Sequence, residues 1–478
     1  MPTPPSPHRA TGPALALLAL AHLIISLDYN IVYVAIPDIG HELGFTTQNL
    51  QWVISAYTVV YGGFLLLGGR MCDLLGRRRM FLLGLTLYAV ASLIGGLATH
   101  PALLIGARAA QGLGGAALFP ATLSLINTTF AEGRPRNRAL GIWASAGAGG
   151  LVLGSLLGGV LTDAFGWESV FYVNVPLAAL ALIATFPLLP PDGPRRPGRF
   201  DIPGALTGTG GTTLLVFALV QGPEHGWTSP AVLAAALTGL ALLAAFATIE
   251  RRGTDALMPL RLFTNRNLSA GVVTTFLFTA TFVSVTYFFT LYLQEVHRYS
   301  PLRTGAAFLI PCAVILAGSA AGGRLMTRHG PRTTLMISLP FGVVGTTLFA
   351  LALSPDGTYL ALLPGLILLS IGQGITFTAM FAAASTGVPA HMQGVASGIA
   401  STGQQTGTAV GLAILVAVAN SGLDGHTGAA LRHATTDGLR TAVLAAAAGM
   451  VLMIIVARAF QTGSPAAAPA PTRHDQTV

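Results

Sequence analysis

Long apolar runs alternate with short polar segments along almost the whole chain. Each run approaches the length of about 20 residues that an α-helix needs to cross a bilayer, so the pattern predicts fourteen transmembrane helices. The first run is longer than the core of a signal peptide and further runs follow it, so we interpret it as a true span. The predicted helices cover residues 12–35, 48–71, 79–98, 101–125, 138–161, 169–189, 202–221, 229–249, 269–293, 303–325, 333–353, 358–385, 394–419 and 438–458.

The composition agrees with a chain that folds in lipid. Hydrophobic residues make up 53% of the 478 residues and charged residues only 9%, whereas about 25% of the residues of an average soluble protein are charged. A soluble chain of this length would need charged surfaces around two or three domains. These proportions predict an all-α polytopic membrane protein with the lipid bilayer as its surroundings.

The positive charge of the chain comes entirely from arginine. The formal net charge is +8, lysine is absent, and the arginines lie mainly in short loops between apolar runs. This placement indicates membrane topology and argues against a nucleic-acid partner. The two cysteines, Cys72 and Cys312, lie in or beside apolar runs without the spacing of metal ligands. We therefore expect neither a disulfide nor a metal site.

The distribution of the arginines also predicts the orientation in the membrane. With a cytoplasmic N-terminus most of the 25 arginines fall in inner segments, and the outer loops hold only Arg298, Arg303, Arg432 and Arg440. This bias follows the positive-inside rule for an even number of spans. We therefore expect a multi-pass protein of the inner (plasma) membrane with both termini in the cytoplasm.

A repeated motif divides the chain into two related halves. The segment GRMCDLLGRRR (69–79) follows the second predicted span, and GRLMTRHGPR (323–332) follows the tenth. Eight spans separate the copies, so the helices divide into six, two and six, and such halves favour transport by rocking against each other. The predicted parts are a cytoplasmic N-terminal tail (1–11), a six-helix bundle (12–189), two inserted helices with flanking cytoplasmic loops (190–268), a second six-helix bundle (269–458) and a disordered cytoplasmic C-terminal tail (459–478).

Two ionisable residues lie well inside predicted spans. At 1.5 Å per residue, Asp28 lies roughly 13 Å from the outer end of the first span and Arg108 roughly 10 Å from the outer end of the fourth. Because the two charges lie at similar depth, we expect them to pair. Ionisable residues inside a membrane usually mark a functional path, so we predict that this pair couples transport to protons. A purely structural ion pair is the alternative.

Polar residues also form a stripe along the first predicted span. His22, Ser26, Asn30 and Tyr33 share one face of a helix, and Asp28 lies almost opposite. Two arrangements are open. Either the stripe lines a central cavity while Asp28 meets another helix, which we favour, or Asp28 lines the cavity.

Further polar residues lie where the second and third predicted spans meet the cytoplasm. Asp73 precedes a run of three arginines. An acid at a helix end can hold the N-terminus of a neighbouring helix, or arginines, and so close a cytoplasmic gate. A solvated loop whose arginines only set the topology is the alternative. The predicted gate residues are Gly69, Asp73, Gly76, Arg77 and Arg78, and the second copy of the motif has Thr327 at the position of Asp73.

Glycines form a predicted packing motif in the fifth span, namely Gly150, Gly154, Gly158 and Gly159. The first three are spaced four residues apart, which places them on one face of a helix and lets another backbone approach closely. Plain helix packing and a role in sealing a transport pathway are both open.

Several of these segments resemble signatures of the major facilitator superfamily. GGRMCDLLGRRR (68–79) is similar to the cytoplasmic motif between its second and third helices, and LIGARAAQGLGGAAL (104–118) to its fourth-helix arginine motif. LDYNIVYVAIP (27–37) and WESVFYVNVP (167–176) resemble first- and sixth-helix signatures of its fourteen-helix drug:proton antiporters. The resemblance covers nearly the whole chain and implies the major facilitator fold and proton-driven export.

The chain departs from these signatures in two places. Ser155 stands where the fifth-helix antiporter motif has proline, and Asn30 and Tyr33 stand where the first-helix signature usually has threonine and asparagine. The first departure keeps open a proton-coupled solute importer on the same fold. A membrane receptor or scaffold that transports nothing is a more remote alternative.

The interpretation we favour is a monomeric exporter of amphipathic organic compounds, such as drugs or antibiotics, that works by alternating access. It is not an enzyme and needs no cofactor, because the proton gradient drives it; no P-loop of the form GxxxxGK[ST] points to ATP. Aromatic and polar side chains on the spans suit such a small-molecule substrate. The candidate lining residues are His22, Ser26, Asn30, Tyr33, Tyr57, Tyr61, Trp143, Asn174, Tyr287 and Gln404.

Overall fold

The structure is a computed structural model that describes residues 11–45, 50–193, 201–252, 258, 260–421 and 428–460. Most of both predicted tails, and the side chain of Ser155, lie outside the described residues. The first half contains α1 (Thr11–Glu42), α3 (Trp52–Leu75), α4 (Arg77–Gly96), α5 (Pro101–Thr129), α6 (Arg134–Phe165), α7 (Ser169–Tyr172) and α8 (Asn174–Leu188). The inserted helices are α9 (Ile202–His225) and α10 (Pro230–Arg252).

The second half begins after a short 3₁₀ turn. Its first span is built from α11 (Arg266–Phe278) and α12 (Ser284–Leu291), each followed by a π-helical turn. The remaining helices are α13 (Pro301–Ala307), α14 (Leu309–Ala352), α15 (Tyr359–Ser385), α16 (Gln393–Asn420) and α17 (Gly428–Ala457).

Thirteen helices among the described residues are long and apolar enough to cross a membrane. One of them, α14, has 44 residues, and at 1.5 Å per residue it would be about 66 Å long, twice the thickness of a bilayer core. Gly330 interrupts it with φ 73° and ψ 177°. Divided there, α14 supplies two spans, and the described chain has the fourteen that the sequence predicts.

The same break occurs in both copies of the repeated motif. Gly76, between α3 and α4, has φ 108°, and Gly330 occupies the matching position in the second copy. Positive φ is strained for side chains with a Cβ atom, so glycine is the residue that lets the chain turn sharply here. The repeat therefore specifies one local geometry twice.

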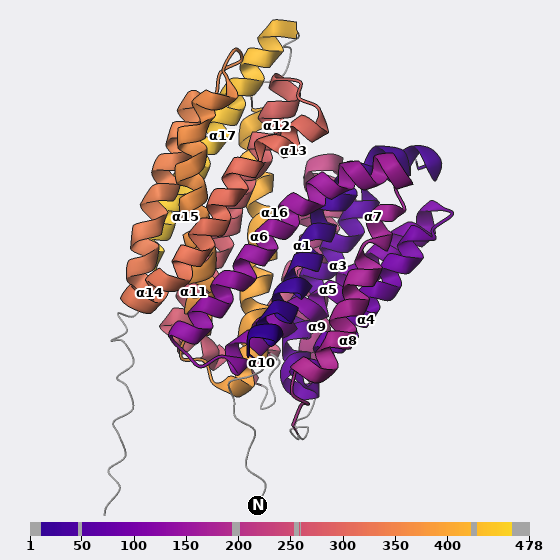
Figure 1. The fold of residues 1–478 in the computed structure, drawn as a ribbon, viewed down its shortest axis with the longest axis vertical. Coiled ribbons are helices and arrows are strands. Elements are labelled where there is room, and N and C mark those ends of the chain that lie inside the picture. The colour runs from indigo at the N-terminus through magenta and orange to yellow at the C-terminus, as the bar shows by residue number, and fades with distance from the viewer. Residues whose placement is uncertain are drawn as a thin grey trace, which may run out of the picture.

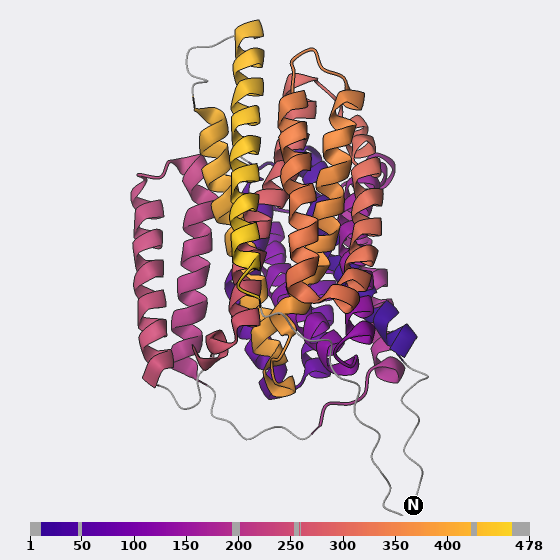
Figure 2. The same ribbon diagram turned by 90° about the vertical axis from the view of Figure 1, so that its left-hand side faces the viewer.

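The helices of the two halves form two groups that stand side by side (Figure 1). Contacts between α3 and α16 and between α6 and α14 join them. The inserted pair α9 and α10 stands beside the bundle (Figure 2), where α9 packs against both α3 and α16. The ring of Trp52 stacks on that of Phe217 at 5.8 Å. The inserted helices thus cover one seam between the halves.

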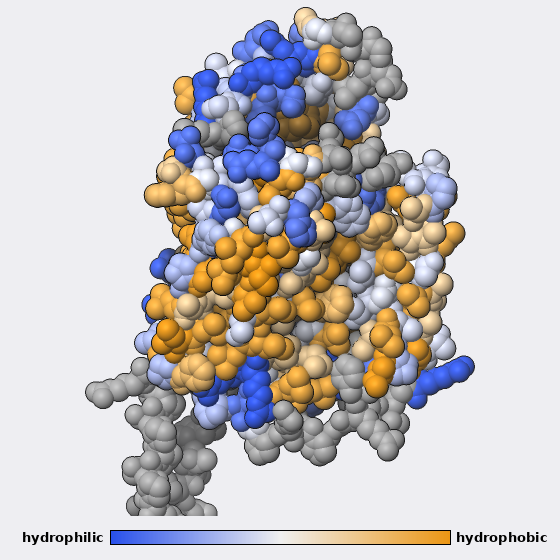
Figure 3. All heavy atoms as spheres, turned by 90° about the vertical axis from the view of Figure 1, so that its right-hand side faces the viewer, coloured by the Kyte–Doolittle hydropathy of each residue, from blue (hydrophilic) through white to orange (hydrophobic). Residues whose placement is uncertain are grey.

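Apolar residues cover the middle of the molecule. Figure 3 shows a broad hydrophobic band over this face, with polar residues gathered towards both ends. Large exposed apolar side chains such as Leu206, Leu237 and Ile455 would face water in a soluble protein. A chain that exposes so much apolar surface needs lipid around it. The end of the bundle that carries Arg77, Arg134 and Arg324 is called the arginine-rich end below.

Glycines on α6 form the interface with α1. A Cβ atom added to Gly150, Gly154 or Gly158 would come within 2.6, 2.4 and 2.9 Å of a carbonyl oxygen of α1. The neighbours on α1 include Ser26 and Asn30, so this part of the polar stripe packs against α6 instead of lining a cavity. Gly159 has nothing within 4 Å, and its inclusion in the packing motif is wrong.

The contrast between two glycines tests this interface. Gly154→Ala places its Cβ against the carbonyl oxygen of Leu27, and such overpacking costs about 1–3 kcal/mol. We expect a lower melting temperature in detergent for this variant. The control Gly159→Ala should be neutral or slightly stabilising, because alanine has the higher helix propensity. Equal melting temperatures for the two variants would show that the close approach of α1 and α6 does not matter for stability.

Candidate functional site

The two membrane-embedded charges meet inside the first half. Arg108 on α5 donates from Nη1 to Oδ2 of Asp28 on α1 at 2.7 Å, and the two side chains are 1% and 0% exposed. The predicted contact is confirmed. Its role in proton coupling stays a prediction.

Neighbouring helices satisfy the remaining hydrogen-bonding groups of Asp28. Its Oδ1 accepts from Nδ2 of Asn174 on α8 at 2.7 Å and from Nε2 of Gln111 on α5 at 3.3 Å. The same Gln111 amide donates to Ser92 on α4 at 2.7 Å. Side chains of α5 and α8 therefore hold the carboxylate directly, and α4 supports it through Gln111.

Arg108 is held equally firmly. Its Nε donates to the carbonyl of Val53 at 2.8 Å, and its Nη1 also donates to Oε1 of Gln111 at 2.9 Å. The guanidinium lies over the ring of Tyr57, 4.4 Å from its centroid, which adds a cation–π contact. Sequence reasoning did not identify Ser92 and Asn174 as members of this network, because membrane depth alone does not identify partners on other helices.

Several predicted substrate-lining residues are buried in the first half. Tyr57 and Tyr61 are almost fully buried, and their rings stack at 5.6 Å. Asn174 is fully buried against Asp28. The prediction that these three side chains line a cavity is wrong for this structure, since helix contacts already occupy them.

His22 and Trp143 belong to an aromatic cluster that joins the two halves. The His22 ring stacks on Trp143 at 3.9 Å, and its Nδ1 lies 2.9 Å from the Trp143 carbonyl oxygen. Trp143 in turn contacts Phe377 and Phe381 of α15, and Phe119 of α5 contacts Phe381. Both His22 and Trp143 are buried. The prediction that they line an open cavity is therefore wrong for this structure.

The other candidate lining residues differ in exposure. Tyr33 on α1 and Tyr287 on α12 are 47% and 43% exposed and belong to different halves. Asn30 donates to the carbonyl of Leu151 on α6. Gln404 is half-buried, and its backbone carbonyl oxygen accepts a hydrogen bond from the Thr279 hydroxyl. Of the predicted set, Tyr33 and Tyr287 are the most exposed, one from each half.

Asp73 links the halves at the arginine-rich end. Its Oδ1 and Oδ2 accept from the backbone N–H groups of Gly394 and Val395 at 3.1 and 2.9 Å. These groups open α16, so the carboxylate caps the N-terminus of a helix of the other half and interacts favourably with its dipole. The predicted contact between this acid and a helix N-terminus is confirmed, and a gating role stays a prediction.

Arg77 extends this contact. Its Nη2 lies 3.5 Å from Oδ1 of Asp73 and also donates to the carbonyl of Ala390, while its Nε donates to Ser124 on α5 at 2.8 Å. Gly69 completes the approach, because a Cβ atom there would lie 2.4 Å from the Gly394 carbonyl oxygen. Two helices of the first half thus hold the start of α16.

Two other predicted gate residues act within the first half. The backbone N–H of Arg78 donates to Oδ1 of Asp192 at 3.0 Å, and its side chain donates to the carbonyl of Phe186. A Cβ atom on Gly76 would clash with Asp192. Gly76 and Arg78 thus anchor the α3–α4 turn to the segment after α8, and their role in a cytoplasmic gate stays a prediction. Sequence reasoning missed Asp192, which lies in a loop.

The second copy of the motif makes a related contact in the opposite direction. Thr327 on α14 accepts a hydrogen bond from Nδ2 of Asn137 on α6 at 3.2 Å, and a Cβ atom on Gly323 would lie 2.6 Å from the Asn137 carbonyl oxygen. Each half thus presents its motif to a helix of the other half. The contact of Asp73 with α16 is charged, and the contact of Thr327 with Asn137 is neutral.

Comparison with known proteins agrees with this architecture. Residues 18–412 match the family model of the Major Facilitator Superfamily. The chain is 37% identical to the puromycin resistance protein Pur8 of Streptomyces alboniger, covering 95% of this chain and 91% of that protein. It is 38% identical to the cephamycin export protein CmcT of Amycolatopsis lactamdurans, covering 94% and 93%.

A solved structure supports the fold independently of sequence. The human organic anion transporter MFSD10 aligns over 95% of this chain and 100% of its own, with a TM-score of 0.67 at 17% identity. An identity this low shows the fold alone. The match of the family model over most of the sequence and the identity to these relatives show that this chain belongs to the major facilitator superfamily.

Proposed function

We propose that this protein exports amphipathic organic compounds, of the antibiotic or drug class, in exchange for protons. The relatives with resistance and export names support the substrate class. The observation that carries the mechanism is the fully buried Asp28–Arg108 pair, because an ionisable carboxylate at membrane depth is costly to keep unless it is used. The chain acts in the plasma membrane as a monomer, with both termini in the cytoplasm.

The contacts between the halves support an outward-facing state with its cytoplasmic side closed. Asp73 and Thr327 join the halves at the arginine-rich end, which the positive-inside rule assigns to the cytoplasm. Tyr33 and Tyr287, by contrast, remain accessible. In the other state the aromatic cluster would separate, and the compound would enter from the cytoplasm.

Protonation of Asp28 is the proposed link between the proton and the movement. A proton arriving from the outer side neutralises the carboxylate and removes its charge-assisted bond to Arg108. Arg108 then keeps its charge without a counter-ion, so the packing of α1 against α5 loosens and the opposite state is favoured. Release of the proton on the inner side restores the pair. The membrane potential adds about 2.3 kcal/mol per charge per 100 mV.

The first prediction from the proposed function concerns Asp28. Asp28→Asn keeps the shape but cannot change charge, so we expect correct insertion and substrate binding with loss of efflux driven by a pH gradient. Asp28→Glu should keep part of the activity, and Arg108→Ala should lose it. Asp38→Asn, an exposed acid on the same helix, is the matched control. The measurement is efflux from vesicles holding equal amounts of each variant, and full activity in Asp28→Asn would make the acid purely structural.

The second prediction concerns Asp73. Asp73→Asn removes the charge that caps α16. The loss costs about 1 kcal/mol, which lowers the ratio of closed to open molecules by a factor of about five. We expect slower transport and a larger inter-spin distance between α3 and α16 at their inner ends. Asp163→Asn, an exposed acid of α6, should change neither. Unchanged distances and rates in Asp73→Asn would rule out the proposed latch.

The third prediction concerns orientation. In a background with Cys72 and Cys312 replaced by alanine, Thr358→Cys should react with an impermeant thiol reagent applied to intact cells. Glu132→Cys should react only after the cells are opened, because it lies at the arginine-rich end. Both side chains are exposed, so accessibility does not depend on packing. The reverse labelling pattern would invert the topology.

A further inference from the structure

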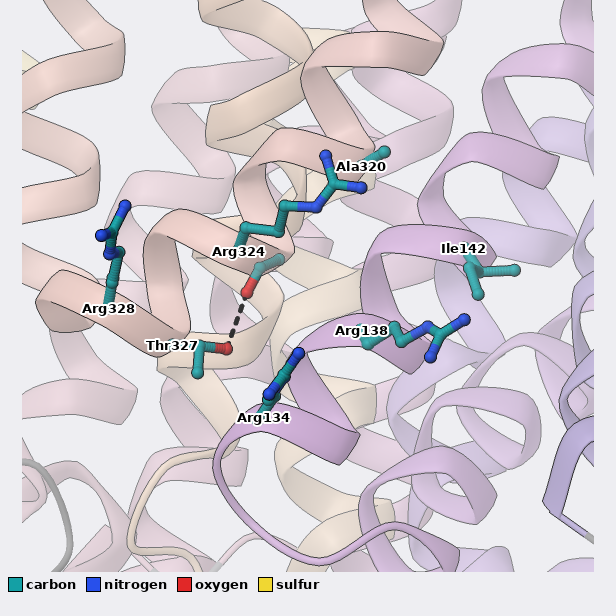
Figure 4. A pocket seen from close by; sticks show the side chains of 8 residues that line it. Arg134, Arg138, Ile142, Ala320, Arg324, Thr327 and Arg328 are labelled. Atoms are coloured by element: carbon teal, nitrogen blue, oxygen red, sulfur yellow. Dashed lines mark hydrogen bonds between the residues drawn. The ribbon is translucent and has the colours of Figure 1, made fainter.

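A groove of about 800 Å³ lies beside the contact between α6 and α14 at the arginine-rich end. Figure 4 shows side chains of both helices around it. Those from α6 belong to the first half and those from α14 to the second. The lining residues are Arg134, Arg138, Ile142, Ala320, Gly323, Arg324, Thr327 and Arg328.

Four of these side chains are arginines, two from each half. Each is exposed, and none forms an ion pair with another residue in the part of the chain that the structure describes. Neighbouring arginines behave differently: Arg77 pairs with Asp73, and Arg136 pairs with Glu132. Four like charges around one groove repel one another, so the groove favours an anion.

The repeat accounts for the lack of a paired acid at this seam in the described part of the chain. Asp73 supplies the negative charge where α3 meets α16, whereas the matching position on α14 is Thr327, which makes only a neutral contact with Asn137. The two seams that close the same end of the molecule therefore differ in charge. Among the described residues no acid meets these arginines, so an anion from another molecule can supply the counter-charge at the α6–α14 seam.

The other lining residues indicate what kind of molecule this is. Ile142 is 39% exposed and Ala320 is also exposed, and both lie on the side of the groove nearer the middle of the membrane. The groove thus joins apolar surface to guanidinium groups that are spread around it, with Arg328 on the side away from α6 (Figure 4). Arginine binds phosphate through paired N–H donors, and basic pockets between transmembrane helices suit lipid headgroups.

We propose that this groove binds the phosphate headgroup of an anionic phospholipid from the inner leaflet, with its acyl chains along the apolar side. A phosphate held by arginines of both α6 and α14 ties the two halves together. The lipid therefore stabilises the state that is closed to the cytoplasm. This second step rests on the proposed alternation between two states, whereas the binding itself does not.

Binding is tested with purified protein and native mass spectrometry. Phosphatidylglycerol should bind the wild type at least about ten times more tightly than phosphatidylcholine, since a few charge-assisted bonds supply that difference. Arg138→Gln/Arg324→Gln removes one guanidinium from each half and should lose the preference. The control Arg251→Gln/Arg252→Gln removes two exposed arginines at the inner end of α10 and should keep it.

Two outcomes would overturn the binding proposal. One is an equal preference for phosphatidylglycerol in the wild type and in Arg138→Gln/Arg324→Gln. The other is displacement of the lipid by glycerol phosphate at the same concentration, which would assign the groove to a soluble anion. Circular dichroism and melting temperature establish that each variant is folded before binding is compared.

The conformational step is tested by the distance between spin labels at the inner ends of α6 and α14. In nanodiscs, replacing phosphatidylcholine by phosphatidylglycerol should shift the population towards the short distance, and Arg138→Gln/Arg324→Gln should abolish the shift. Identical distributions in the two lipids would refute the stabilising role. Asp28→Asn should still bind the lipid, so failure of proton coupling and failure of this proposal give different results.

Discussion

The buried ion pair between Asp28 and Arg108 constrains the whole first half. Moving two charges out of water costs several kcal/mol for each, and only close geometry with further hydrogen bonds offsets that cost. Gln111, Asn174 and the carbonyl of Val53 provide those bonds at 3.3 Å or less. The helices that carry them can therefore shift relative to one another only by breaking contacts that the charges require. A change of charge on the Asp28 carboxylate therefore alters hydrogen bonds that connect several helices.

The closure at the arginine-rich end is built twice from one motif, with different chemistry. A carboxylate caps the start of α16 at one seam, and a threonine meets an asparagine at the other. Glycines bring the backbones together at both, since Gly69 faces α16 and Gly323 faces α6. The shared glycines give the repeat its common shape, while the residue at the acidic position decides how strongly each seam depends on charge.

Features that depend on local pattern could be predicted from the sequence, and those that depend on rotation about helix axes could not. Hydropathy located the spans, the repeat located Gly330, and depth along the helices paired Asp28 with Arg108. Depth does not determine which way Tyr57 or Asn174 points, so the sequence predicts both as lining residues, whereas in the structure they support the ion pair. Asp192 was missed because a loop acid has no periodic neighbours, and its partners lie more than a hundred residues earlier.

One helix connects the ion pair with the closed end. Arg108 and Gln111 of α5 hold Asp28, Phe119 lies in the aromatic cluster that joins the halves, and Ser124 accepts from Arg77 beside Asp73. Sixteen residues separate Arg108 from Ser124, or about 24 Å along the axis. A displacement of α5 near Arg108 can be passed along this helix, in which Pro120 lies between Phe119 and Ser124 and can act as a bend. Because α5 contacts Asp28, the aromatic cluster and the arginine-rich end in turn, it offers a physical route for the proposed coupling between protonation of Asp28 and opening of that end.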